Sequence, residues 1–378
     1  MLFQYKYSKI FSCNNTIFKE VIPIPCKYKF ISDTLRSRIE DGTYPPETTL
    51  PTEQQLCTTF SASRQTVRQA LKCLVDAGLI DRRQGSGSWV LPIDPSARSR
   101  RTVAIITTYI SDYIFPGILR EAEAVLSRNN CTTLLYATSN QVSNERRILM
   151  DILDNQNIDG ILVEGTKAAL PNPNLDLYLK LQARKIPLVF FNSKYSNLDA
   201  VSILDDNYNG GHMLVDYLVS KGHRKISGIF KNDDMQGHQR YAGFLDGLRD
   251  NNLPMEDSKI MWYCTEDKPR MTPGSSLWDE KIKPLLTDCT AVVCYNDEAA
   301  SYLVQCLLQY NISIPDKIAV VSFDDSLYSN LSARKITSLS HTPLNAGRLS
   351  AEALLKLFDG KEVPSQNMPW SLMEKETS

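Results

Sequence analysis

The sequence has little of what several classes of protein require. Its 378 residues contain no run of about 18 uncharged apolar residues, and residues 1–25 lack the uninterrupted apolar segment of a signal peptide. Histidine occurs only four times, and the nine cysteines include no CxxC pair. We therefore expect no membrane span, no metal and no cofactor, and a protein that works in the cytoplasm with its thiols reduced.

Net charge is also small, at −1, but it is unevenly distributed along the chain. Residues 1–102 carry 15 Lys and Arg against 9 Asp and Glu, whereas residues 103–378 carry 27 against 34. A basic segment joined to an acidic one indicates that only the basic part meets a polyanion. At roughly 100 to 200 residues per domain, the length favours two or three domains.

The basic segment has the pattern of a small helical domain. Apolar residues recur at helical spacing over 28–39, Thr52 and Gln55 form a capping-box pair, and Ser63 is placed to cap a third helix. One face of that third helix is apolar and the other is cationic, and a Gly-rich turn at 84–88 predicts a hairpin after it. This order is typical of a winged helix-turn-helix, although a cationic helix face is more often merely solvated.

Particular motifs favour the DNA-binding interpretation. The stretches LRSRIEDGTY, LPTEQQL, SASRQTVRQAL, LVDAGLI and RRQGSGSWV resemble the GntR family of bacterial winged-helix repressors. The resemblance implies that the DNA contacts are Arg64, Gln65, Thr66, Arg68 and Gly87. It makes Arg82 and Arg83 weaker phosphate candidates, and Thr52 and Glu53 are expected to cap the second helix.

Composition sets the expected domain limits. We expect a winged-helix domain at 26–91, a linker at 92–102 rich in Pro, Arg and small polar residues, and an effector domain at 103–378. Residues 1–25 show no clear period. They are consistent with a disordered arm or with a misplaced translation start.

The effector segment alternates short apolar strands with helical stretches, which predicts a parallel α/β fold. The alternation restarts near residue 226, so we expect two consecutive sets of βα units and hence two lobes. Polar residues follow several strands, where open α/β sheets bind ligands. Each alone is more often a turn or cap, but their repetition favours a ligand site; they are Glu164, Asn192, Asn296, Asp297, Asp324 and Asp325.

This second segment resembles the periplasmic-binding-protein fold of LacI and GalR type repressors. By that resemblance Arg240 in HQRYAGF, Asn296 in YNDE and Asp324 in SFDDS correspond to sugar contacts. The same comparison implies further effector contacts at Asp112, Phe115, Glu164, Asn192 and His341. Phe115 suits a core position equally well, and a lone histidine near a strand end is usually structural.

Longer stretches narrow the resemblance to L-arabinose-responsive repressors of the AraR type. They are TTYISDYIFP, SNERR, DGILVEGTKAAL, GHRKISGIFKNDDMQGHQRYAGF, CYNDE and FDDS. The resemblance implies a homodimer that binds operator double-stranded DNA, represses sugar-utilisation genes and is released by the sugar. The sequence departs from the pattern before Lys27, where it has an extension, and at Ser322-Phe323, where Gly-Tyr is commoner.

Two alternatives stay open. The first is a repressor of the same architecture whose effector is another pentose, a hexose or a purine, since the candidate contacts do not separate these ligands. The other alternative is an enzyme, either a sugar-processing α/β protein or an aminotransferase-like fusion. The absence of GxSxG, Walker A and GxGxxG elements argues against catalysis.

Overall fold

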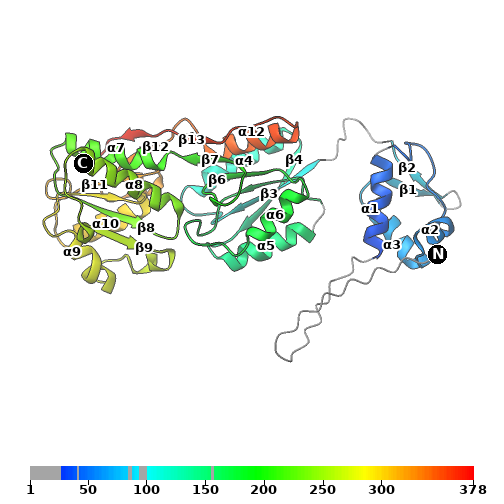
Figure 1. Cartoon of the computed structure of the whole chain (residues 1–378), viewed down its shortest axis with the longest axis horizontal. Coiled ribbons are helices and arrows are strands. Elements are labelled where there is room, and N and C mark those ends of the chain that lie inside the picture. The colour runs from blue at the N-terminus through cyan, green and yellow to red at the C-terminus, as the bar shows by residue number, and fades with distance from the viewer. Residues whose placement is uncertain (1–26, 41, 84–86, 93–99, 155–156) are drawn as a thin grey trace, which may run out of the picture. The chain divides into compact units, whose positions relative to one another are not determined.

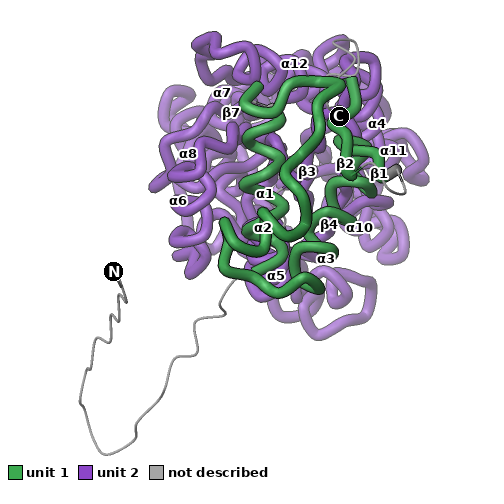
Figure 2. The backbone as a smooth tube through the Cα atoms, turned by 90° about the vertical axis from the view of Figure 1, so that its right-hand side faces the viewer, with its two compact units in different colours: residues 1–99 green, residues 100–378 purple. Residues whose placement is uncertain are grey.

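The computed structural model of the chain describes residues 27–40, 42–83, 87–92, 100–154 and 157–378 (Figure 1). These residues form two compact units, one within residues 1–99 and one spanning residues 100–378, which Figure 2 colours separately. The expected extension at 1–25 and residues 93–99 of the expected linker lie outside the described residues. Among the helices that are described, none combines the length and apolarity needed to cross a bilayer.

The first unit packs three helices against a small hairpin. Its core consists of apolar side chains at helical spacing, among them Ile31, Leu35, Leu56 and Leu71, all at most 1% exposed. This arrangement is the expected winged helix-turn-helix. Its elements are α1 (Lys27–Glu40), α2 (Glu53–Phe60), α3 (Arg64–Asp76), β1 (Ile80–Arg83) and β2 (Gly87–Val90).

The ends of α2 and α3 are fixed by the residues that the sequence indicated. The Thr52 hydroxyl accepts a hydrogen bond from the Gln55 N–H at 3.3 Å, and the Gln55 side chain accepts one from the Thr52 N–H at 2.8 Å. The Ser63 hydroxyl accepts from the Thr66 N–H at 3.2 Å. Gly78, with φ of +68°, follows the last turn of α3 and lets the chain reverse into β1. Both predicted caps are confirmed.

The hairpin pairs β1 and β2 in antiparallel register, from Ile80 opposite Val90 to Arg83 opposite Gly87. The connecting residues 84–86, which belong to the predicted Gly-rich turn, lie outside the described residues. Gly87 has φ of +89°, a conformation that favours glycine. The wing therefore begins its return strand at a residue whose backbone few other side chains would tolerate.

The second unit contains two α/β lobes, as the sequence predicted. In the first lobe all strands are parallel, in the order β13-β7-β6-β5-β3-β4, with α4 and α12 over one face and α5 and α6 over the other. The lobe comprises β3 (Arg101–Thr107), α4 (Phe115–Arg128), β4 (Cys131–Ala137), α5 (Val142–Asp154), β5 (Gly160–Val163), α6 (Leu175–Ala183), β6 (Leu188–Asn192), β7 (Val201–Asp205), α12 (Ala346–Phe358) and β13 (Gln366–Met368).

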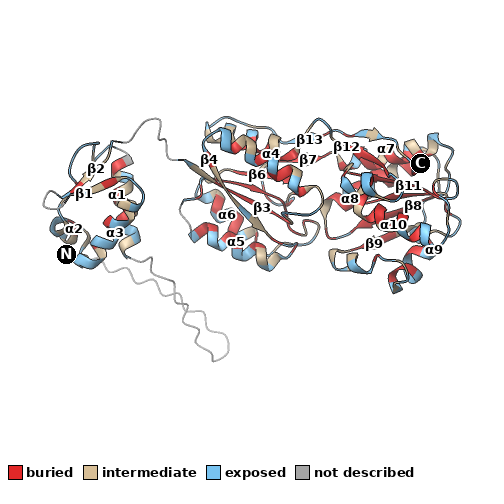
Figure 3. Cartoon of the chain, turned by 180° about the vertical axis from the view of Figure 1, so that it is seen from behind, coloured by how far each residue is buried: buried red, intermediate tan, exposed pale blue. Residues whose placement is uncertain are grey.

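The second lobe repeats this plan, with strand order β14-β12-β11-β10-β8-β9 and only β14 antiparallel. Its elements are α7 (Asn207–Ser220), β8 (Ile226–Lys231), α8 (Met235–Asp250), β9 (Ile260–Tyr263), β10 (Ala291–Cys294), α10 (Asp297–Gln309), β11 (Ala319–Phe323), α11 (Leu327–Leu331), β12 (Thr337–Ser340) and β14 (Ser371–Met373). Short helical turns are η1 (Asp257–Lys259), η2 (Thr265–Arg270), η3 (Trp278–Ile282) and α9 (Lys283–Leu285). Figure 3 shows that the central strands of both lobes are buried.

The lobes are not two consecutive halves of the segment, so that part of the prediction needs correction. The chain crosses between them at Asp206, at 341–345 and at 369–370. The second crossing returns α12 to the first lobe, where a Cβ on Gly347 would lie 1.9 Å from the Ile118 carbonyl oxygen of α4. Two helices in such close contact belong to one layer. Three crossover segments therefore connect the lobes.

Candidate functional site

The outer face of α3 has the exposure that a reading helix needs. Arg64, Gln65 and Arg68 are exposed, whereas Val67 and Ala70 on the opposite face are fully buried. Thr66 is partly buried, and its hydroxyl lies 2.8 Å from that of the capping Ser63. The first turn of α3 therefore presents two long polar side chains together with a hydroxyl already engaged in the cap.

Glu53 binds two arginines, a role that the sequence did not reveal. It was expected to cap α2, but its carboxylate accepts a hydrogen bond from Arg68 at 2.9 Å and another from Arg82 of β1. Partial burial by itself would raise the pKa of Glu53, but the two guanidinium groups outweigh burial and hold that pKa below its usual value. Glu53 thus orients two candidate DNA-contacting arginines that come from different elements.

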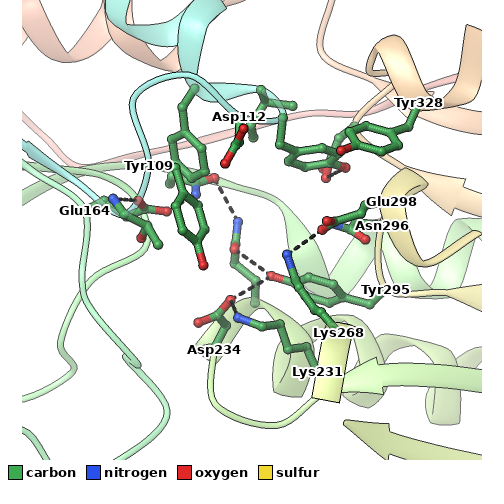
Figure 4. Close-up of a pocket in the computed structure, with 17 residues that line it drawn as sticks. Tyr109, Asp112, Glu164, Lys231, Asp234, Lys268, Tyr295, Asn296, Glu298 and Tyr328 are labelled. Atoms are coloured by element: carbon green, nitrogen blue, oxygen red, sulfur yellow. Dashed lines mark hydrogen bonds and ion pairs between the residues drawn. The ribbon is translucent and has the colours of Figure 1, made fainter. Parts of the chain in front are cut away.

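The two lobes enclose a cavity of about 280 Å³, which we call the sensor cavity (Figure 4). Residues from the loop after β3 and from the carboxyl ends of β5, β6, β8, β10 and β11 line it, as the strand-end rule predicts. Six of the eight expected effector contacts are brought together here. They are Asp112, Phe115, Glu164, Asn192, Asn296 and Asp324.

Glu164 and Asn192 form the first-lobe wall of the sensor cavity. The Asn192 amide donates to Glu164 Oε1 at 2.5 Å, and the Thr108 N–H donates to Glu164 Oε2 at 2.8 Å. Burial raises the pKa of Glu164 to about 7, although the hydrogen bonds from Thr108 and Asn192 oppose the shift. Near neutral pH this carboxyl can therefore both donate and accept a hydrogen bond.

Phe115 is both a lining residue and a core residue. It is 7% exposed, packs in the apolar cluster beneath α4, and meets the Tyr109 ring edge-on with centroids 6.1 Å apart. Phe115 is thus a core residue, as one of the two interpretations expected, and its contact with an effector stays a prediction. The cavity has an aromatic corner of the kind that packs against the C–H face of a sugar.

Asn296 and Asp324 form the second-lobe wall. Asn296 Oδ1 accepts from the Ala299 N–H at 3.0 Å and caps α10. The Asp324 carboxylate accepts from Arg240 at 3.0 Å and from the Tyr113 hydroxyl, which reaches across from the first lobe. Asp324 is thus oriented from both lobes at once.

Arg240 lies behind the cavity wall and does not line the cavity. Its guanidinium is 1% exposed, donates to Asp324 and to the Asn207 side chain at 2.8 Å, and stacks 4.2 Å from the Phe323 ring centroid. A second carboxylate, Asp205, lies 3.5 Å from it. The structure therefore gives the arginine a position from which it holds other polar residues in place.

His341 also lies outside the sensor cavity. It lines a neighbouring space of about 630 Å³ beside the crossover segments, together with Asp205 and Asn345. His341 Nε2 lies 2.9 Å from Asp205 Oδ1, and its ring stacks on Trp370. Of the expected effector contacts, Arg240 and His341 are the two that the structure does not bring into the sensor cavity.

Several lining residues were missed by sequence reasoning. Lys231 ends β8 and pairs with Asp234 at 2.5 Å; burial by itself would lower the pKa of Lys231, but Asp234 and Asp233 raise it above its usual value. The strand-end rule was sufficient to find Lys231. Lys268, paired with Glu298, comes from the irregular turn η2, for which no periodic signal exists.

Asp297 is a buried acid at the start of α10 that accepts three hydrogen bonds. It is fully buried and accepts hydrogen bonds from the Ser322 hydroxyl, from the Ser338 hydroxyl at 2.7 Å and from the Ser326 N–H at 2.6 Å. Burial and the charge of Asp324 raise its pKa to about 7, against these hydrogen bonds. Ser322, where the sequence was noted to depart from the resemblance, is therefore a partner of this buried acid.

Comparisons with known proteins agree with this two-unit architecture. Residues 27–90 match the family of bacterial regulatory proteins called gntR, and residues 215–378 match a periplasmic binding protein-like domain. An arabinose metabolism transcriptional repressor from Halalkalibacterium halodurans is 34% identical over 88% of this chain and 89% of its own length. One from Geobacillus stearothermophilus is 35% identical over 89% and 92%. The chain belongs to this family of repressors.

Solved structures extend the comparison to the fold of the effector unit. A LacI-type regulator from Alkaliphilus metalliredigens, complexed with D-xylulofuranose, gives a TM-score of 0.61 at 24% identity and covers 74% of this repressor and 99% of that chain. A complex of the regulator CelR with cellobiose gives 0.61 at 19% identity, over 84% and 92%. The predicted fold class and the resemblance to the L-arabinose-responsive repressors are confirmed.

Proposed function

We propose that this repressor binds operator DNA through α3 and the wing, and that L-arabinose in the sensor cavity releases it. The observation that carries the proposal is the sensor cavity itself, where polar strand ends of both lobes meet an aromatic corner. Hydroxyl-rich ligands are recognised by such paired donors and acceptors. As a regulator of genes, the protein would act in the cytoplasm.

Charge supports a neutral sugar over an anionic effector. The described residues that line the sensor cavity include five carboxylates, on Asp112, Glu164, Asp234, Glu298 and Asp324, but only two lysines. Both lysines already have carboxylate partners. A phosphate or uronate group would therefore enter a negative field with no unpaired lysine to meet it, and its desolvation would be costly.

Size supports a single sugar ring. A volume of about 280 Å³ lies just below the range of roughly 300 to 1,000 Å³ that is usual for ligand sites. That space favours a pentose over a disaccharide or a nucleotide. The family of the repressor makes L-arabinose the first pentose to test, and hexoses or purines remain the competing effectors.

On the DNA side, we propose that Arg64, Gln65, Thr66 and Arg68 contact the major groove and that Gly87 approaches the backbone. Support comes from the exposure of Arg64, Gln65 and Arg68, and from the hold of Glu53 on Arg68. Phosphate contacts would supply much of the affinity, so operator binding should weaken as salt rises.

A homodimer is also part of the proposal, because near-palindromic operators are read by two-fold pairs of winged helices. Leu327 and Leu331 of α11 lie four residues apart on one helical face and are 70% and 79% exposed. Two adjacent leucines with such exposure suit burial against a second copy.

Gel-shift titration of the full-length protein on DNA upstream of arabinose-use genes tests the function. We expect retention on the DNA without sugar and release by L-arabinose, and a weaker response or none to D-xylose, D-glucose and adenine. Release by one of those compounds and none by L-arabinose would refute the effector assignment. We also propose that the sugar is bound without turnover, so conversion of L-arabinose on incubation would contradict a purely regulatory role.

A further inference from the structure

The three crossover segments between the lobes meet at one side chain, His341, which follows β12. Its Nε2 lies 2.9 Å from Asp205 Oδ1, at the first crossing, and its Nδ1 lies 2.9 Å from the Pro369 carbonyl oxygen, at the third. The ring stacks on Trp370 with centroids 3.5 Å apart, and the Trp370 indole N–H donates to the Asp206 carbonyl at 3.0 Å. One imidazole therefore joins all three segments.

The partners of the ring decide its protonation state. A backbone carbonyl only accepts hydrogen bonds, and so does an ionised carboxylate. Asp205 also receives donors from Gln236 at 3.1 Å and Arg240 at 3.5 Å, as an ionised carboxylate would. A neutral imidazole that donates its one N–H to the Pro369 carbonyl leaves an unprotonated Nε2 at 2.9 Å from the Asp205 carboxylate, whereas the imidazolium places a positive charge there.

We infer that His341 is a protonated tie between the crossover segments, a positioning residue and not a sugar contact, and that its proton links sugar binding to pH. The inference rests on the proposed function for its second part only. Burial by itself lowers the pKa of His341, but the hydrogen bond and charge of Asp205 outweigh burial and hold that pKa above its usual value. The direction of the shift agrees with the contacts.

The tie is connected to the sensor cavity by a chain of hydrogen bonds. The Gln236 amide that donates to Asp205 also lies 2.9 Å from Asn192 Oδ1, and Asn192 donates to Glu164. Arg240 makes a second connection, because it contacts both Asp205 and Asp324. Polar groups that would contact the sugar are thus no more than a few hydrogen bonds from the residues that join the lobes.

Other charges near the ring must be separated from it in any test. Asp205 and Asp324 act on the charge of the ring, and Arg240 lies 3.5 Å from Asp205. Asp112, Arg120 and Asp325 line the same space as His341. Glu164 and Asp297, whose pKa values burial raises to about 7, titrate in the same range. A variant that removes only the imidazole distinguishes its proton from theirs.

The sign of the pH dependence follows from the tie. The double contact needs the imidazolium, so it stabilises this lobe arrangement below the His341 pKa and is lost as pH rises through it. If L-arabinose binds this arrangement, its affinity should fall as pH rises from 6.5 to 8.5. Linkage to one proton sets a limit of about ten-fold per pH unit.

The first experiment measures the proton directly. In the full-length protein labelled with 15N-histidine, long-range 1H–15N spectra report both ring nitrogens of each of the four histidines, and H341Q assigns the resonance. We expect a His341 pKa above 6.5 that falls in D205N, with both ring nitrogens protonated at pH values below that pKa. A His341 pKa at or below 6.5, or one unmoved in D205N, would overturn the tie. This arm needs no sugar.

The second experiment measures the coupling. Calorimetric titration with L-arabinose from pH 6.5 to 8.5 compares the wild type, H341Q and, as a control, H238Q, whose imidazole lies exposed on α8. We expect H341Q to bind L-arabinose with a flatter pH profile and H238Q to match the wild type. An H341Q profile as steep as that of the wild type overturns the linkage. No L-arabinose binding in any of the three refutes the proposed effector instead, and the spectra still decide on the tie.

Discussion

Replacing Asp324 by asparagine should leave a repressor that stays on its operator when sugar is added. The carboxylate is 6% exposed and lines the sensor cavity, where Arg240 and Tyr113 orient it. A hydrogen bond to a charged group contributes about 1.5 to 3 kcal/mol, so its loss should weaken L-arabinose binding by about 10 to 150-fold. Calorimetry gives the affinity directly, and gel shifts give the sugar concentration needed for release.

Asparagine is chosen over alanine because of Arg240. An alanine would leave this buried guanidinium with Asp205 as its remaining carboxylate partner, and breaking a buried pair commonly costs about 3 to 5 kcal/mol of folding free energy. The amide keeps an oxygen near Arg240 at nearly the same volume. Thermal unfolding should therefore show a folded D324N protein, which separates lost sensing from lost structure.

Asp325 supplies the matched control. It is the next residue, but its carboxylate binds Lys375 at 2.6 Å and lies outside the sensor cavity. D325N should be released from DNA at about the wild-type sugar concentration. If D324N were also released at that concentration, or if both variants failed equally, the assignment of Asp324 to the sugar site would be wrong.

Three further variants test separate parts of the structure. R64A should lose operator affinity and lower the slope of log affinity against log salt by about 1, with L-arabinose binding unchanged; an unaltered gel shift removes Arg64 from the interface. E164Q should make the free energy of unfolding depend less on pH between about pH 5 and 8. The pKa of the Glu164 carboxyl rises from 4.5 to about 7 on folding, so this group contributes about 3 kcal/mol of stability that is lost as pH rises through that range. Urea unfolding at several pH values measures the dependence, and equal pH profiles for E164Q and the wild type contradict the prediction. L331K should shift the protein toward monomers in sedimentation, whereas L179K, at the exposed Leu179 of α6, should not; two identical profiles would argue against α11 as the dimer contact.

Local patterns were sufficient for much of the fold. The caps at Thr52 and Ser63 depend on residues three positions apart, and the central strands are continuous apolar runs, so neighbours in the chain specify both. The return of α12 to the first lobe could not be predicted in this way. It depends on the close contact of Gly347 with α4, between segments more than 200 residues apart.

In the candidate site, too, the sequence predicted the residues that depend on local pattern but not the contacts between distant segments. Glu164, Asn192 and Asp324 follow predicted strands, and parallel strands bring their carboxyl ends to one edge whatever the loops do. The pairing of Glu53 with Arg68 and Arg82, and the contacts of His341 with Asp205, join distant segments through side chains. No spacing in the sequence encodes such pairs, so these residues were given simpler roles.

Energetics explain how so small a ligand can control DNA binding. Release needs only a difference in sugar affinity between two lobe arrangements, and coupling of about 1 to 3 kcal/mol changes operator affinity about 5 to 150-fold. One charge-assisted hydrogen bond formed in a single arrangement is of that size. In the proposed role, Asp324 would meet this condition, because Tyr113 of one lobe and Arg240 of the other orient it together. When the lobes separate, the Asp324 carboxylate must lose its contact with Tyr113 or with Arg240. The same movement would therefore weaken the proposed hydrogen bond from the sugar to this carboxylate.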